Sequence, residues 1–216
     1  MVNDEAFTNA RKLARKTIRK KIQSALQLDF PYQFRPSEFG RKNGKPAAVL
    51  ILISLSEDPD RFEILMTRRT DRVESHKGQY ALPGGMKDEE DDLEEGLKTT
   101  ALRETEEEMG ISRDLIEVLG CLPEIWVPSG FLVQPWVGVL KPEKNEIQIQ
   151  ENPYEIDFWF WVSKTDFFSP GVYRTESHQV GEVQVQLDVF QIGEHRIWGA
   201  TAAILKNFFG RLEKSD

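Results

Sequence analysis

Charge is distributed unevenly along this chain, and one acidic segment limits what the sequence can fold into. Of the 216 residues, 28 are Lys or Arg and 36 are Asp or Glu, which gives a net charge of −8. The segment Lys87–Glu108 alone holds 11 acidic and 3 basic side chains, so it carries the whole excess. The remainder shows no basic face of the kind that duplex nucleic acids require, so no nucleic-acid partner is expected. The acidic segment predicts either a divalent-cation site or a solvated helix.

Composition predicts a folded globular protein. Hydrophobic residues make up 39% and charged residues 30%, which is typical neither of a disordered chain nor of a membrane protein. No apolar run approaches the roughly 20 residues that span a bilayer. Because the N-terminus has no apolar core of the secretory type, we expect a cytoplasmic protein without a membrane partner. The single cysteine, Cys121, excludes an internal disulfide and is interpreted as a core thiol. The oligomeric state stays open, with a homodimer as one alternative.

Hydrophobic periodicity predicts two unequal parts. Asp4–Leu28 is expected to form a helix, interpreted as a surface helix packed on the main domain, with a membrane-surface or targeting helix as the alternative. Phe30–Lys45 contains prolines and glycines and is expected to be a linker. We therefore divide the chain into residues 1–45, an N-terminal helix and linker, and residues 46–216, one globular domain.

The second part combines several predicted strands with few helices. Helices are expected at Leu93–Met109, with Gly110 as its C-terminal stop, and at Arg196–Leu212. Strands are expected at Ala47–Leu55, Phe62–Thr67, Leu115–Leu122, Val133–Leu140, Phe158–Val162 and Val183–Gln191. This order is typical of an α/β fold of the α+β type, an α/β/α sandwich around a mixed β-sheet.

The acidic helix places three carboxylates on one face. Glu104, Glu107 and Glu108 stand at i, i+3 and i+4, where like charges repel unless water or a cation neutralises them. Hard oxygen ligands of this kind suit Mg²⁺ or Mn²⁺. Arg103 can orient Glu107, four residues along the helix, by a charge-assisted hydrogen bond. Spacing alone supports a metal site and an ordinary acidic surface helix equally.

A sharp turn, Pro83-Gly84-Gly85, precedes this helix and lets the backbone approach a ligand closely, because glycine has no side chain. Together with the acidic helix it resembles the Nudix box, which ends in Arg-Glu-aliphatic-x-Glu-Glu-x-Gly-aliphatic. The segment Arg103–Ile111 matches that ending, except that Thr105 replaces the aliphatic residue. Glu95 corresponds to the leading glutamate of the box. Gly85 matches the glycine of the box. Between Gly85 and Glu95 the chain has four more residues than the family usually has, and we expect this insertion, in Lys87–Asp92, to be an exposed acidic loop.

A second resemblance, to Nudix enzymes that cleave coenzyme A, covers roughly Ala47–Leu205. It rests on Leu65–Thr70 and Gly78–Gly85, which keep the spacing of the stretch that precedes the box in that group. Glu74 departs from the pattern, which has arginine there, and Leu82 departs where the pattern has phenylalanine. An anion in place of a cation near an anionic substrate opposes its binding.

The resemblance implies roles for individual residues. The metal ligands are expected to be Glu104, Glu107, Glu108 and Gly85, and catalytic roles fall to Glu107, Glu104 and Arg103. Glu155, in a loop before a strand, is expected to join the metal site or act as base, with a turn carboxylate as the alternative. Substrate contacts are expected from Arg68, Arg69, Gly84 and His76, and the two arginines could equally form surface salt bridges.

The expected activity is metal-dependent hydrolysis of a pyrophosphate bond in a small-molecule nucleotide, with Mg²⁺ or Mn²⁺ as cofactor. Metal ions neutralise the anhydride and lower the pKa of a bound water, which a carboxylate positions or deprotonates. The favoured substrate is coenzyme A or an acyl derivative, giving 4′-phosphopantetheine and adenosine 3′,5′-bisphosphate. The alternatives are a broader hydrolase of ADP-ribose, sugar nucleotides or dinucleoside polyphosphates, and a Nudix-fold sensor that binds a nucleotide without cleaving it.

Overall fold

The computed structural model describes residues 2–29, 44–56, 58, 61–72, 77–91, 95–180 and 183–215. Its centre is a mixed sheet built around β1 (Lys45–Leu55), which runs parallel to β7 (Phe131–Leu140) and antiparallel to β2 (Phe62–Arg69). β1 is buried along nearly its whole length. This explains why its sequence is a continuous apolar run rather than an alternating one.

The remaining strands of this sheet pair with the three central strands. The path runs β3-β2-β1-β7-β5, while β4 pairs with β1, β6 with β7 and β8 with β2. Their bounds are Tyr80–Ala81 for β3, Gly84–Met86 for β4, Ile116–Cys121 for β5, Ile125–Val127 for β6 and Ile156–Ser163 for β8. Because β1 is parallel to β7 and antiparallel to its other partners, the predicted mixed sheet is confirmed.

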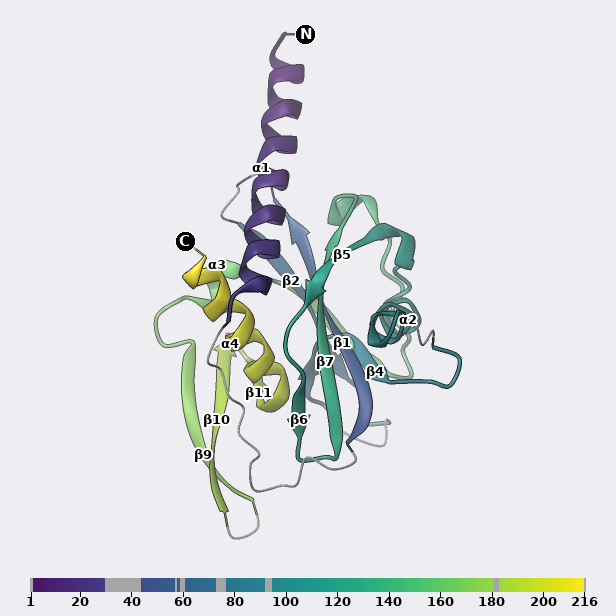
Figure 1. Cartoon of the computed structure of the whole chain (residues 1–216), viewed down its shortest axis with the longest axis vertical. Coiled ribbons are helices and arrows are strands. Elements are labelled where there is room, and N and C mark those ends of the chain that lie inside the picture. Colours follow the sequence, from purple (N-terminus) through teal and green to yellow (C-terminus); the bar gives the residue numbers. More distant parts are fainter. Residues whose placement is uncertain are drawn as a thin grey trace.

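Helices cover both faces of the sheet. Figure 1 shows α2 (Leu97–Met109) on one side and α4 (Gly199–Lys214) on the other. Each helix packs on its own apolar cluster, with Ala101 and Met109 of α2 in one and Leu205 and Phe208 of α4 in the other. The predicted α/β/α sandwich is therefore confirmed. Short helices lie at Arg113–Leu115 (η1), Lys144–Glu146 (η2) and Lys164–Phe167 (α3).

A second, three-stranded antiparallel sheet was not predicted as such. It has the order β11-β10-β9, with bounds Tyr173–Val180 for β9, Val183–Ile192 for β10 and His195–Trp198 for β11. In Figure 1, β9 and β10 lie beyond α4, whereas β11 reaches the main sheet, since His195 contacts Tyr80 of β3. Only β10 had been expected. Arg196–Trp198, expected to start the last helix, pairs with β10 instead, and the helix begins at Gly199.

The acidic helix α2 is shorter than predicted. It begins at Leu97 rather than Leu93, directly after Gly96, whose positive φ of 61° ends the preceding turn. Residues 92–94 lie outside the described residues. The stop at Gly110 is confirmed, because this residue takes the left-handed conformation with φ 67°.

Helix α1 (Val2–Gln27) is partly built into the domain. Its last turns bury Ile18, Ile22, Ala25 and Leu26 in the same core as α4, while Figure 1 shows its N-terminal part projecting away from the body. Arg15 donates hydrogen bonds to the carbonyl groups of residues 140–142. Packing on the main domain is thus confirmed for the second half of this helix. None of the described helices combines the length and apolar character needed to cross a bilayer.

One smaller expectation needs correction. Cys121 is exposed at the end of β5 rather than buried in the core. The linker expected at Phe30–Lys45 lies, up to residue 43, outside the described residues.

Candidate active site

Two glycines of β4 bring the sheet into close contact with α2. A side chain at Gly84 would place its Cβ 2.3 Å from the carbonyl oxygen of Ala48 in β1. A side chain at Gly85 would place its Cβ 2.5 Å from the carboxylate of Glu104 in α2. The close approach predicted for this turn is therefore made by the protein itself, because glycine alone leaves room for the β1 backbone and for the Glu104 carboxylate.

Glu108 is the buried carboxylate of the site, with a side chain only 2% exposed. One of its oxygens accepts a hydrogen bond from Arg69 Nη1 at 3.0 Å, and the other accepts one from the Gly84 amide at 3.1 Å. Burial raises the pKa of Glu108 to about 8, although Arg69 and the Gly84 amide act in the opposite direction. A buried carboxylate needs such partners, since an unpaired buried charge is strongly unfavourable.

Arg103 connects the other two predicted ligands. Its Nη1 donates to Glu104 Oε1 at 3.0 Å and to Glu107 Oε2 at 2.9 Å. The predicted contact between Arg103 and Glu107 is thus present. The two glutamates differ in exposure. The Glu104 side chain is 16% exposed, whereas the Glu107 side chain is 54% exposed. Burial raises the pKa of Glu104, against the lowering effect of Arg103.

Glu155 comes from a distant part of the chain and joins the same site. The Asn152 amide donates to the carbonyl oxygen of Glu108 at 2.8 Å, which attaches this loop to the end of α2. Thr70 holds the loop from β2, through its amide to the Glu155 carbonyl and its hydroxyl to the Tyr154 carbonyl. The Glu155 carboxylate lies 3.9 Å from Arg69 Nη2, so Arg69 stands between Glu155 and Glu108.

We call Glu104, Glu107, Glu108 and Glu155 the carboxylate cluster. Its members are close enough to act on one another. Glu104 and Glu155 raise the pKa of Glu108. Likewise, Glu107 and Glu155 raise the pKa of Glu104. Within the described part of the chain, no three acidic, histidine or cysteine side chains already converge on one metal position. The cluster instead faces Arg69 and Arg103, so its four carboxylates exceed its two cations.

The two arginines predicted to contact substrate point in different directions. Successive side chains of a strand alternate between faces. Accordingly, Arg69 reaches the carboxylate cluster, while Arg68 bonds Asp157 at 2.9 Å and lies opposite the exposed Phe158 in β8. Of these two arginines, Arg69 is therefore the one that contacts the carboxylate cluster. His76, and Glu74 beside it, lie outside the described residues.

Other acidic residues of the box stand apart from the cluster. Glu95, which we expected to be the leading glutamate of the box, lies in the turn before α2 and pairs with Lys98 at 2.8 Å. Glu106 pairs with Arg113 at 2.9 Å. Leu82, one of the departures from the coenzyme A pattern, is 3% exposed and belongs to the core on the α4 side.

Asp91 is a site residue that the sequence reasoning missed. The four-residue insertion was expected to be an exposed loop, yet Asp91 within it is only 3% exposed. Its carboxylate accepts hydrogen bonds from Arg103, Thr100 and the Asp88 amide. Burial alone would raise the pKa of Asp91, but these bonds outweigh it and lower the pKa to about 2. A signal was available, because aspartate often bonds a nearby backbone amide in turns.

Comparison with known proteins places this geometry in a family. The sequence model of the NUDIX domain matches residues 44–180. An uncharacterized Nudix hydrolase of Photorhabdus laumondii, NudL, is 35% identical over 163 residues, which are 76% of this chain and 82% of that protein. The mitochondrial Nudix hydrolase 15 of Arabidopsis thaliana is 33% identical over 81% of this chain and 58% of that protein.

One solved structure supports the fold. The MutT protein from Methanosarcina mazei superimposes with a TM-score of 0.51 at 16% identity, over 81% of this chain and 96% of that one. The protein belongs to the Nudix family. It is a Nudix pyrophosphohydrolase that acts on nucleoside diphosphate derivatives. The match ends at residue 180, before α4, so the division into residues 1–45 and 46–216 stays a prediction.

Proposed function

We propose that the protein hydrolyses the pyrophosphate bond of coenzyme A or an acyl derivative, with a divalent metal ion, to 4′-phosphopantetheine and adenosine 3′,5′-bisphosphate. One observation carries the proposal. The stretch that resembles the coenzyme A group, residues 65–70 and 78–85, supplies the groups that meet the carboxylate cluster. Arg69 bonds Glu108, Gly84 donates to Glu108, and Gly85 makes room for Glu104. Two of the residues that we expect to contact substrate, Arg69 and Gly84, therefore meet carboxylates that we expect to act in catalysis.

The residues present fit Mg²⁺ or Mn²⁺. Nudix hydrolases generally need such an ion, and the cluster offers only oxygen donors, which these hard cations prefer. The negative charge of the cluster exceeds the positive charge of its two arginine partners, so a bound cation would relieve the mutual repulsion of the carboxylates. Glu104, Glu107 and Glu108 would hold the ion, with Gly85 beside them. The ion would neutralise the pyrophosphate and lower the pKa of a bound water.

The chain's own residues then have distinct tasks. Glu107 is the most exposed of the three helix carboxylates, so it is the one best able to reach a water molecule. Glu155 is the second carboxylate available as a base, held by Asn152 Nδ2 at 3.2 Å and facing Arg69. Arg103 orients Glu104 and Glu107, and Arg69 orients Glu108.

A substrate panel tests the proposal. Purified protein with Mg²⁺ or Mn²⁺ is offered coenzyme A, ADP-ribose, sugar nucleotides and diadenosine polyphosphates, and the products are separated by chromatography. The expected result is the highest kcat/KM for coenzyme A or an acyl derivative, with adenosine 3′,5′-bisphosphate released. Turnover of ADP-ribose without turnover of coenzyme A would instead select the broader hydrolase, and no turnover of any compound would leave the sensor.

A further inference from the structure

We propose that three aromatic side chains from β8 and β11 receive the base of the nucleotide, and that an ion pair beside them makes this site selective for adenine. The aromatic residues are Phe158, Phe160 and His195, which we call the aromatic platform. The proposal rests on the proposed function only in that the substrate carries a nucleotide. It gives a binding role to His195, which lies outside residues 44–180, the part that matches the NUDIX domain.

The three rings of the aromatic platform lie nearly parallel. Phe158 stacks on Phe160 with ring centroids 5.4 Å apart and on His195 with ring centroids 5.8 Å apart, at interplanar angles of 21° and 25°. His195 is held by Tyr80 of β3, because its Nδ1 shares a hydrogen bond with the Tyr80 hydroxyl at 2.8 Å. Phe158 is 44% exposed. A planar base can therefore stack on Phe158, and such stacking favours the binding of any nucleobase.

A hydrogen-bond donor and an acceptor lie beside the exposed ring. Arg68 is the partner of Phe158 across β2 and β8, so their side chains lie on one face with Cβ atoms about 5 Å apart. Arg69 pairs with Ile156, which leaves Asp157 as an extra residue in β8. An extra residue of this kind re-aims a side chain and is common next to active sites. Here Asp157 accepts a hydrogen bond from Arg68 Nη1 at 2.9 Å.

The edge of adenine complements this ion pair. Adenine presents an amino donor next to a ring-nitrogen acceptor, whereas guanine presents two acceptors at the same positions. The Asp157 carboxylate can accept from the amino group while Arg68 donates to the ring nitrogen. Within the described part of the chain, Arg68 Nη2 makes no hydrogen bond, so this donor is available to a ligand. Guanine would instead set its carbonyl oxygen against the Asp157 carboxylate, which repels it.

The aromatic platform and the carboxylate cluster meet at one end of the main sheet. β2 ends at Arg69, and β8 begins at Ile156. Arg69 contacts the carboxylate cluster, whereas Arg68 lies opposite Phe158. Phe158 follows Glu155 by three residues, which corresponds to about 10 Å along a strand. The ribose and 5′-phosphate of a nucleotide can bridge this separation by passing round the strand ends, with the base on the platform and the anhydride at the carboxylates.

Binding of AMP and GMP tests the platform, because neither nucleotide contains an anhydride that the protein could cleave. Isothermal titration of the purified protein with Mg²⁺ should show AMP binding about 5- to 100-fold more tightly than GMP. Phe158→Ala should weaken AMP binding about 5- to 100-fold, and Phe158→Trp should restore it. The matched control is Phe168→Ala, since Phe168 is also 44% exposed but its ring contacts Phe209 of α4.

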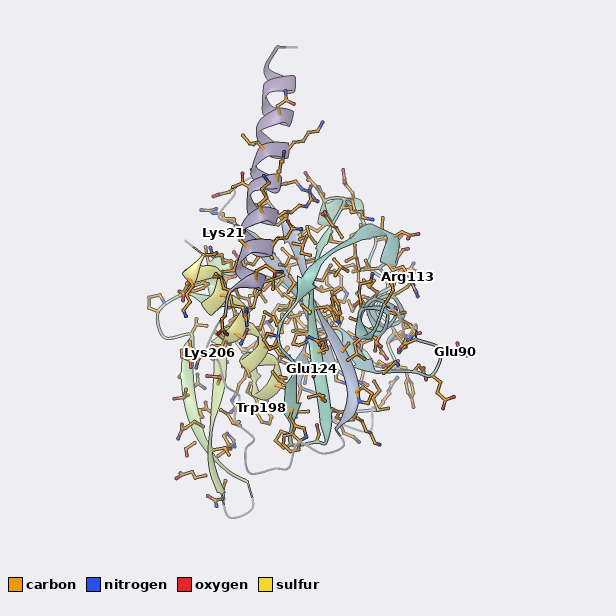
Figure 2. All side chains as sticks on the ribbon, viewed as in Figure 1. Lys21, Glu90, Arg113, Glu124, Trp198 and Lys206 are labelled. Carbon is orange, nitrogen blue, oxygen red and sulfur yellow. The ribbon has the colours of Figure 1, made fainter. Side chains whose placement is uncertain are left out.

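The ion pair is tested separately from the rings. Arg68→Gln and Asp157→Ala should each remove most of the preference for AMP over GMP, while GMP binding changes little. The matched control is Arg113→Gln, which should keep the preference. Arg113 is 47% exposed and pairs with Glu106 at 2.9 Å, and Figure 2 shows it on the α2 side of the molecule.

Several outcomes would overturn the proposal. They are equal binding of AMP and GMP by the wild type, no AMP binding at all, unchanged AMP binding in Phe158→Ala, or an equal loss in Phe168→Ala. Should Phe158→Ala fail to fold, Phe158→Leu keeps an apolar side chain without the ring. It should lose AMP affinity by a similar factor, and unchanged affinity there would contradict the stacking role.

These measurements also distinguish the platform from the proposed function. A protein that leaves coenzyme A intact but binds AMP more tightly than GMP would refute the hydrolysis of coenzyme A and support the platform. A protein that cleaves coenzyme A but keeps full AMP affinity in Phe158→Ala would refute the platform alone. For any adenine nucleotide that is cleaved, Phe158→Ala should raise KM with little change in kcat, because stacking is present both before and during the reaction.

Discussion

The two faces of the main sheet hold their helices by different means. On the α4 face, the contact with the sheet is apolar, with Phe208 fully buried and its ring 6.2 Å from that of Phe62 in β2. The buried polar residues of α4, Asn207 and Arg211, bond each other and the end of α1 instead. On the α2 face, apolar Ala101 and Met109 share the contact with the buried polar side chains Thr100, Thr105 and Glu108. Helix α2 is also joined to the sheet by hydrogen bonds from Arg69 and Gly84 to Glu108.

This difference separates stability from activity. Burial of apolar surface is the dominant favourable contribution to folding. Buried ion pairs contribute little or nothing net, because desolvation offsets their attraction. We therefore expect the α4 face to dominate the free energy of unfolding and the α2 face to dominate turnover. Four predictions test that contrast.

The largest effect is expected from Glu107→Gln on the α2 face. This change removes a carboxylate that we assign to metal binding or water activation, so kcat should fall about 10²- to 10⁴-fold. Since the side chain is half exposed, the melting temperature should barely change. The matched control is Glu106→Gln, one residue earlier and paired with Arg113, which should keep its activity. Full activity in Glu107→Gln would refute its assigned role.

On the opposite face, Phe208→Ala should have the reverse signature. Removing a fully buried phenylalanine typically costs about 3–5 kcal/mol of stability. Denaturant unfolding should show this loss, while kcat of the protein that remains folded stays near the wild-type value. If kcat per folded molecule fell as steeply as in Glu107→Gln, the proposed separation of the two faces would be wrong.

The neighbouring glycines of β4 sharpen the contrast between two adjacent residues. Gly84→Ala forces a side chain onto the β1 backbone at a φ of 152°, and such strain costs about 1–3 kcal/mol. Gly85→Ala instead meets the end of the Glu104 side chain, which can swing away. We therefore expect Gly84→Ala to lower the melting temperature, and Gly85→Ala to lower kcat with a smaller change in stability. Equal effects of both variants on kcat and stability would contradict this view.

The smallest effect concerns acid stability. The pKa of Asp91 is lowered from 3.8 to about 2 in the folded protein, so between these values the unfolded chain binds more protons. Stability should then fall as the pH decreases from about 4 to 2. Denaturant unfolding of Asp91→Asn over this range should show a shallower loss than wild type. Parallel curves for the two proteins would show that Asp91 contributes nothing to the acid dependence.

Several features of the site could be predicted from local patterns in the sequence. The face shared by Glu104, Glu107 and Glu108 follows from helix geometry, which repeats every few residues, and the stop at Gly110 follows from the conformation that glycine allows. The apolar run of β1 likewise predicted a buried strand. These features need no knowledge of which segments meet.

The distant groups that complete the site could not be predicted in this way, because they depend on how the chain folds. Arg69 meets Glu108 across 39 positions of the chain, and Asp91 meets Arg103 across 12. The start of the last helix was misplaced for the same reason, since pairing with β10 keeps Arg196–Trp198 extended. Long-range pairs depend on strand register and loop closure, and neither leaves a periodic signal in the sequence. The acidic helix could therefore be predicted from the sequence, whereas the partners that orient its carboxylates could not.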